Sequence, residues 1–165
     1  MISHDDSPFL ADLLVRHPEY EAWLENELKT NRKKTREEYL AGARNAVSAG
    51  GLAELHRFHR REILRIGARD LSGRAAMGDI TNELSWLADA TIQMAVEAAS
   101  QEINERYGRI ETQLAVIGVG KLGGEELNFS SDIDIIYIFG DESQTDRSIR
   151  IARRITEILS ESTDE

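Results

Sequence analysis

The sequence predicts an α+β protein in which a mainly helical region, residues 1–108, is followed by an α/β region, residues 109–165. Two observations support this prediction. Up to Gly108, apolar residues recur at intervals of three and four, which is the period of an amphipathic helix. After Gly108, two short runs of strand-forming residues are separated by a segment rich in glycine and small polar residues.

Composition narrows the class of protein. The 165 residues suffice for one domain with a buried core and are too few for two complete domains. The net charge of -10 argues against general binding of nucleic acid or anionic lipid. The absence of cysteine excludes disulfides, thiolate zinc sites and cysteine nucleophiles. No apolar run reaches the roughly 18 residues of a membrane helix, and the N-terminus lacks a signal-peptide pattern, so we expect a cytoplasmic protein with no membrane partner.

Three helices are expected in the first fifty residues. Ser7-Pro8 is a typical helix start, and the apolar residues that follow end near Pro18. Residues 20–29 form a second helical segment. The Thr-x-x-Glu sequence at 35–38 has the form of a capping box and predicts a third helix, which ends at the Gly50-Gly51 pair.

Two longer helices complete the helical region. Residues 52–69 alternate apolar positions with arginines, and we expect their basic side to be solvated, although it could face an acidic nucleotide site. After a break, Ile80 begins the apolar seam of a long packed helix that ends near Gly108. Ala-rich stretches in that helix allow close contacts with its neighbours.

Residues 112–119 and 132–139 are predicted to be buried strands, because both are rich in β-formers. Residues 135–139 are apolar on both faces, which is typical of an interior strand. A last amphipathic helix is expected from about Thr145, where isoleucines return to helical spacing.

The glycine-rich segment between these strands is a candidate phosphate-binding loop. Residues 118–123 match the GxGxxG pattern of dinucleotide-binding proteins. That pattern needs a helix opening at its third glycine, and the short segment 124–131 before the next strand is a poor helix, so we do not expect a Rossmann site. A Walker A loop is excluded because Gly-Lys-Ser/Thr is missing. The segment instead offers backbone N–H groups and the small hydroxyls of Ser130 and Ser131 to a phosphate.

Asp132 and Asp134 form an Asp-x-Asp pair at the start of the second predicted strand. On a strand these side chains would point to one face, with Cα atoms roughly 6.5–7 Å apart. Two such carboxylates can bind the pair of Mg²⁺ ions that clamps a phosphoryl displacement. An EF-hand is excluded because Ile135 and Ile136 occupy positions that a calcium loop fills with glycine and polar ligands. Asp-x-Asp alone is commonly a turn or cap, but its place between a glycine segment and a buried strand favours a metal site.

The segment VIGVGKLGGEELNFSSDIDIIYIF, residues 116–139, resembles the signature of the glutamine synthetase adenylyltransferase family, within the DNA polymerase beta-like nucleotidyltransferase superfamily. Residues 55–73 and 83–99 look like the helical lead-in of that family. The resemblance implies a helical region followed by a partial nucleotidyltransferase α/β core. The family carries two such domains, of which the N-terminal one removes AMP from a tyrosine of glutamine synthetase and the C-terminal one attaches it. The sequence ELNFSSDID is more similar to the N-terminal copy.

The resemblance also implies a site. It makes Asp132 and Asp134 catalytic metal ligands for Mg²⁺ or Mn²⁺ and places Ser131 beside the phosphates. The implied reaction is phosphorolysis, in which inorganic phosphate releases ADP and free tyrosine. The implied partners are glutamine synthetase, the PII signalling protein, adenine nucleotide and phosphate. The nucleotide loop would consist of Gly120, Lys121, Leu122, Gly123 and Gly124.

The superfamily completes its metal site with a third carboxylate on a later strand. Asp141, Glu142 and Asp146 follow the second strand too closely and are expected to lie in a loop. We therefore expect an N-terminal fragment of a longer polypeptide, with little or no turnover by itself. Two alternatives stay open: the AMP-attaching copy, and a docking or regulatory module for glutamine synthetase or PII.

Other chemistry-bearing residues have simpler explanations. His56 and His59 lie one turn apart, with Glu62 a further turn on, a spacing that can bind a metal. Because no matching fourth ligand is visible, we expect them to pack at the surface or between domains. Trp23 and Trp86 are expected to anchor the core or an interface.

Overall fold

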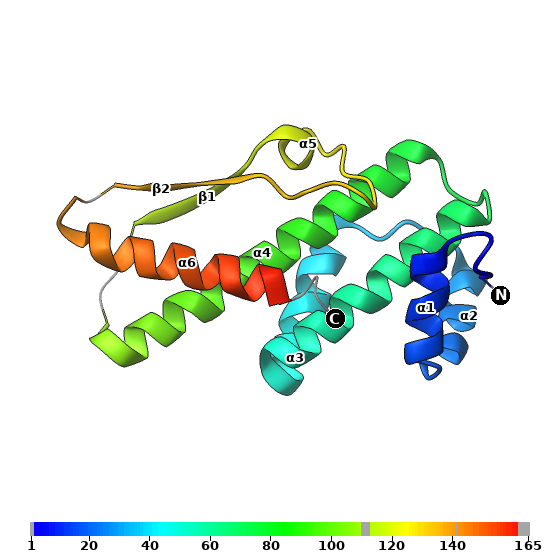
Figure 1. The fold of residues 1–165 in the computed structure, drawn as a ribbon, viewed down its shortest axis with the longest axis horizontal. Coiled ribbons are helices and arrows are strands. Elements are labelled where there is room, and N and C mark those ends of the chain that lie inside the picture. Colours follow the sequence, from blue (N-terminus) through cyan, green and yellow to red (C-terminus); the bar gives the residue numbers. More distant parts are fainter. Residues whose placement is uncertain (1, 110–112, 141, 162–165) are drawn as a thin grey trace.

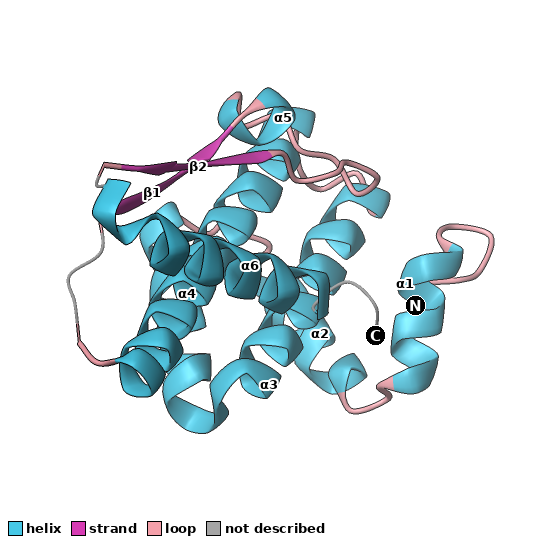
Figure 2. Cartoon of the chain, turned by 60° about the vertical axis from the view of Figure 1, so that its left-hand side comes forward, coloured by secondary structure: helices cyan, strands magenta, loops and turns pink. Residues whose placement is uncertain are grey.

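The computed structural model describes residues 2–109, 113–140 and 142–161. It confirms a mainly helical α+β fold, in which a two-stranded antiparallel sheet lies along one side of the helices (Figures 1 and 2). Among the described helices, none is both long enough and apolar enough to cross a membrane. The elements in chain order are α1 (Pro8–Arg16), α2 (Tyr20–Thr30), α3 (Arg36–Leu71), α4 (Met77–Tyr107), β1 (Leu114–Gly118), α5 (Gly120–Gly123), β2 (Ile135–Phe139), a 3-10 turn (Glu142–Gln144) and α6 (Thr145–Glu161).

The predicted starts of the first and third helices are confirmed by their capping contacts. The Ser7 hydroxyl accepts a backbone N–H of the first turn of α1 at 3.4 Å. Thr35 and Glu38 make both bonds of the capping box, at 3.3 and 2.8 Å. The predicted break at Gly50 and Gly51 is a kink inside α3, where Gly51 has a φ of 69° that side chains rarely adopt. These capping residues and the glycine pair therefore determine where α1 and α3 begin and where α3 bends.

The helices share apolar clusters with the sheet. The largest cluster joins α3 to α4 and includes Leu122 and Leu127 from the segment between the strands. A second cluster packs α1 and α2 against the C-terminal part of α3. In the third, Ile151, Ile155 and Ile158 of α6 contact α4 and the inner face of the sheet. The glycine-rich segment between the strands therefore packs directly against the largest apolar cluster, through Leu122 and Leu127.

The sheet departs from the prediction of buried strands. Its register pairs Leu114 with Phe139 and Gly118 with Ile135. The inner face packs on α4 and α6, whereas on the outer face Ile136 and Ile138 are 50% and 51% exposed. The expectation of an interior strand, buried on both sides, was wrong because helices cover only one face in the described part of the chain.

The predicted strand limits also need correction. Residues 132–134 precede β2, which begins at Ile135, and Val119 follows β1. Thr112, the expected start of the first strand, lies outside the described residues. Asp141 lies outside them too. Asp146 is not in a loop, since it occupies the first turn of α6.

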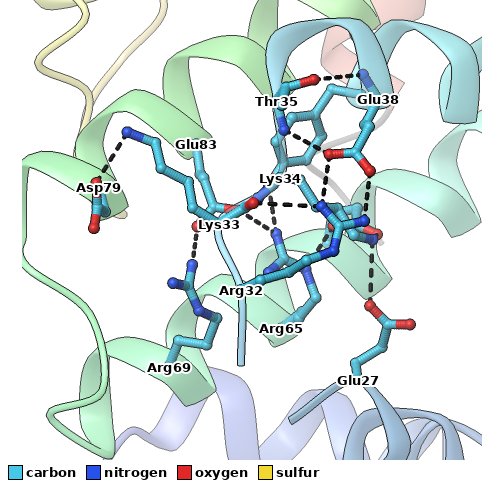
Figure 3. Close-up of polar contacts among 12 residues, drawn as sticks. Glu27, Arg32, Lys33, Lys34, Thr35, Glu38, Arg65, Arg69, Asp79 and Glu83 are labelled. Carbon is cyan, nitrogen blue, oxygen red and sulfur yellow. Dashed lines mark hydrogen bonds and ion pairs between the residues drawn. The ribbon is translucent and has the colours of Figure 1, made fainter. Parts of the chain in front are cut away.

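A buried ionic cluster joins α3 to α4 (Figure 3). The Glu83 carboxylate, fully buried, accepts hydrogen bonds from Arg65 at 2.6 Å, from the Tyr39 hydroxyl at 3.0 Å and from Arg69. Burial raises the pKa of Tyr39 well above its usual range, so its phenol remains a donor. The expectation that this basic helix side is solvated was wrong for Arg65 and Arg69, which are 2% and 3% exposed.

The segment before α3 closes over the same cluster. The backbone N–H of Lys34 donates to Glu83 at 2.9 Å, and the Lys34 ammonium donates to Glu62 at 2.7 Å. Glu62 also accepts from Arg65 at 2.8 Å. Glu62, Glu83 and Arg65 thus each have several partners, and Arg69 is paired with Glu83, so every one of these buried charges has an opposite charge beside it.

We expect Glu83→Gln to lower the free energy of unfolding by about 3–5 kcal/mol, because it leaves two buried arginines without a full counter-charge. Urea denaturation followed by circular dichroism measures this. The matched control is Glu97→Gln, since Glu97 is exposed and pairs with Arg44 at 3.3 Å. The control should lose less than about 1 kcal/mol, and an equal loss in both variants would contradict the role given to Glu83.

Candidate functional site

The glycine segment forms a tight turn directly after β1. The residue Gly120 has a φ of 56°, a left-handed conformation that favours glycine. A Cβ at Gly123 would lie 2.6 Å from the carbonyl oxygen of Gly118, so only glycine allows this close approach. Where a Rossmann site would open a helix at its third glycine, this turn opens the single-turn helix α5 at Gly120.

Two amides of the turn are used within it. The N–H of Gly123 donates to the Val119 carbonyl at 3.2 Å, and the N–H of Gly124 donates to Gly120 at 3.1 Å. A phosphate contact by the amides of Gly123 and Gly124 would therefore require breaking a hydrogen bond of the turn. The Lys121 side chain is exposed, whereas Leu122 is buried in the main core and fixes the turn there.

The segment that carries the acids is organised by Asn128. Its side-chain oxygen accepts the Ser130 backbone N–H at 3.0 Å and the Ser131 hydroxyl at 2.9 Å. The Ser131 hydroxyl in turn accepts the N–H of Asn128 at 3.0 Å. Sequence reasoning missed Asn128, although an asparagine two residues before a serine is typical of an Asx turn.

Polar contacts with α4 hold this segment in place. The N–H of Leu127 donates to the Ser85 hydroxyl at 3.4 Å, and the Leu127 side chain is buried. Asn82 donates to Glu125 at 3.3 Å and accepts from Lys33 at 2.9 Å. One turn of α4, residues 82–85, therefore carries both the centre of the buried cluster, Glu83, and the support of the candidate site.

The structure places Asp134 against the glycine turn. Its carbonyl oxygen accepts the N–H of Val119 at 2.9 Å, which extends the pairing of the strands by one residue. A Cβ at Gly120 would lie 3.1 Å from the Asp134 carboxylate oxygen Oδ2. The glycine thus leaves room for the carboxylate as well as adopting the required φ.

Asp132 lines a groove that lies apart from the glycine turn. A groove of about 620 Å³ lies between α1, α3, α4, the acid segment and the end of α6. Both Ser131 and Asp132 line it, as do Ile133 and Ile135. The acid segment therefore lies between the glycine turn and the groove.

The donor chemistry of the acid pair suits a hard divalent cation. Both Asp132 and Asp134 are exposed, and carboxylate oxygens are ligands that Mg²⁺ and Mn²⁺ prefer. Within the described residues, no group of three or more His, Asp or Glu side chains is placed to hold a metal. A cation bound here would complete its coordination with substrate phosphates or water, as Mg²⁺ commonly does.

The other candidates have structural roles. Glu62 is held by Arg65 and Lys34, so it is not available to complete a metal site with the histidines. His56 is buried. The two tryptophans are partly buried against the core, as expected, with Arg61 5.5 Å from the Trp23 ring and Lys33 4.7 Å from the Trp86 ring.

His59 lines the groove in its neutral form. Burial, together with electrostatic repulsion from the neighbouring His56 and Arg60, lowers the pKa of His59 to about 4. At neutral pH the side chain therefore adds no charge to the groove.

Gly123→Ala should lower the free energy of unfolding by about 1–3 kcal/mol, because its new methyl group clashes with the Gly118 carbonyl. Urea denaturation provides the measurement. Gly124→Ala is the control, since a Cβ there meets its nearest atom at an ordinary 3.5 Å. Similar losses in both variants would show that the close approach at Gly123 is unimportant.

Stability should fall as the pH is lowered from about 6.5 to about 4, because over this range the unfolded state takes up a proton on His59 that the folded state does not. Above pH 6.5 this contribution is fully present. In His59→Gln the free energy of unfolding, measured in urea at several pH values, should decline less over the same range. Identical slopes for the two proteins would contradict the lowered pKa.

Comparisons with known proteins agree on one family. The family model described as glutamate-ammonia ligase adenylyltransferase matches residues 4–165. The chain is 38% identical, in an alignment of 128 positions that covers 67% of the chain, to the bifunctional glutamine synthetase adenylyltransferase/adenylyl-removing enzyme of Nitrosococcus oceani. Proteins with the same description from Nitrosomonas europaea and Shewanella loihica are 35% and 32% identical over 72% and 95% of the chain.

The relatives are much longer than this sequence. The matched regions cover 13%, 15% and 18% of the three relatives. The family model spans nearly the whole chain, including the glycine turn and the acid segment. The chain therefore belongs to the glutamate-ammonia ligase adenylyltransferase family.

Proposed function

We propose that the chain forms part of a metal-dependent nucleotidyltransferase site that removes AMP from a tyrosine of glutamine synthetase. The observation that carries this proposal is the placement of the Asp134 carboxylate against Gly120, with Asp132 two residues away. The printed names of the relatives, which include adenylyl removal and glutamine synthetase, support the substrate. The similarity of ELNFSSDID to the deadenylylating copy supports the direction of the reaction.

The proposed reaction is a phosphorolysis. An oxygen of inorganic phosphate bonds to the adenylyl phosphorus while the bond from that phosphorus to the tyrosyl oxygen breaks. The products are ADP and tyrosine, whose oxygen takes up a proton. Little covalent chemistry is asked of the protein, so the task of its residues is to orient the reactants and to balance charge.

The residues divide this task according to position. Asp132 and Asp134 would hold Mg²⁺ or Mn²⁺, which when bound offsets the negative charge on the phosphates. Lys121 is exposed on the turn and would bind the attacking phosphate. Ser131 lies next to Asp132, and its hydroxyl, which donates to Asn128 at 2.9 Å, would have to turn away from Asn128 to donate to a phosphate oxygen.

The first test is Mn²⁺ binding, measured by calorimetry with and without ADP, on the chain and on Asp132→Asn/Asp134→Asn. We expect ADP to strengthen Mn²⁺ binding and the double variant to weaken it at least about tenfold, which corresponds to about 1.4 kcal/mol. Asp146→Asn is the control, since Asp146 is an exposed carboxylate on α6. Equal Mn²⁺ affinity in all three proteins would overturn the assignment of the acid pair.

The direction of the reaction needs a separate assay. Changing the two aspartates should abolish ADP release from adenylylated glutamine synthetase with phosphate and should leave AMP attachment to the unmodified protein from ATP intact. A full-length family member that carries this segment is the suitable enzyme, with the same two aspartates changed. Loss of AMP attachment alone in that variant would identify this segment with the opposite activity.

A further inference from the structure

The groove beside Asp132 is larger and more apolar than a phosphate site needs. Its volume of about 620 Å³ falls in the range of small-molecule and side-chain sites. Leu13, Ile63 and Leu159 from three different helices line it. Phe9 and Phe129 also line it, although they are 62% and 41% exposed. Exposed aromatic side chains beside an apolar hollow are typical of binding surfaces.

The charges at the groove nearly balance. Asp12 and Arg16 of α1 carry opposite signs, and so do Asp132 and Arg60. His59 contributes no charge at neutral pH because its pKa is about 4. Such a surface suits an uncharged ring with its flanking peptide better than it suits a polyphosphate.

The position of the groove relates it to the reaction. Asp134 faces the glycine turn, whereas Asp132 faces the groove. In an in-line displacement, the attacking and leaving oxygens lie on opposite sides of the phosphorus. If the attacking phosphate binds at the turn, the leaving group lies on the groove side.

We propose that this groove binds the tyrosine side chain of the protein substrate and the peptide next to it, with Phe9 and Phe129 as specificity-determining residues. This inference rests on the proposed function, which supplies the tyrosyl leaving group. Tyrosine suits the groove because its ring is apolar while its oxygen, esterified to the adenylyl phosphorus, points toward Asp132 and Ser131.

The test compares three probes by calorimetry with Mn²⁺ present: AMP, O-adenylyl-N-acetyltyrosinamide, and a tyrosine-containing peptide of glutamine synthetase without AMP. We expect the adenylyl-tyrosine compound to bind at least about tenfold more tightly than AMP. Phe9→Ala and Phe129→Ala should each lose most of this difference while binding AMP as the wild type does.

Two exposed apolar residues outside the groove provide matched controls. Val15 lies on α1, as Phe9 does, and is 75% exposed. Ile117 of β1 is 43% exposed, which is close to the exposed fraction of Phe129. The variants Val15→Ala and Ile117→Ala should bind all probes as the wild type does. Circular dichroism and urea midpoints confirm that each variant is folded.

The outcomes separate this inference from the proposed function. If AMP binds but the tyrosine adds no affinity, the groove inference is overturned and the proposed function stands. If the phenylalanine variants weaken AMP and the compound equally, the groove binds the adenine base and the inference is again overturned. If AMP does not bind while the peptide does, and the phenylalanine variants lose it, the groove inference stands and the nucleotide site fails.

Discussion

The carboxylate of Glu83 is the buried charge around which the helical part of the molecule is arranged. Removing a carboxylate from water is costly, and three donors, Arg65, Arg69 and Tyr39, offset that cost inside the protein. A fourth donor, the backbone N–H of Lys34, connects the segment before α3 to the Glu83 carboxylate. Because these donors come from α3 and from the segment before it, one side chain of α4 fixes how the two long helices meet.

This arrangement determines where the candidate site can form. Asn82 and Ser85, which flank Glu83 in sequence, hold the segment that leads to the acids. Leu122 and Leu127 add apolar contacts with the same core. The site is therefore assembled from loops whose positions are set by α4, and precise placement of loops by rigid elements is what positional catalysis requires.

Much of the fold follows from local sequence signals. Ser7, the capping box at Thr35 and Glu38, and the glycine pair at the kink of α3 each act through neighbouring residues, so the helix ends were predictable. The burial of Arg65 and Arg69 was not, because their partner Glu83 lies on another helix and an arginine-rich helix side more often faces water. Local pattern cannot identify a partner that only the fold brings close.

In the candidate site, too, some features were predictable from local sequence and others depend on the fold. The glycine turn was predictable from the spacing of its glycines. The backbone requires glycine at two of these positions, because Gly120 has a positive φ and Gly123 lies against the Gly118 carbonyl. The orientation of the acids was not predictable, since Asp132 and Asp134 precede β2 and do not follow the alternation of a strand. The groove joins residues from α1 to α6, so no local pattern could reveal it. That the acid pair binds a metal stays a prediction.

The isoleucines on the outer face of the sheet make the behaviour of the chain in solution depend on ionic strength. An exposed apolar face on paired strands favours association between molecules. The net charge of -10 opposes this by mutual repulsion. The Debye length shortens from about 10 Å at 0.1 M salt to about 3 Å at 1 M, so added salt weakens the repulsion and leaves the apolar attraction in place. Dilute buffers of low ionic strength are therefore the conditions that keep such molecules apart.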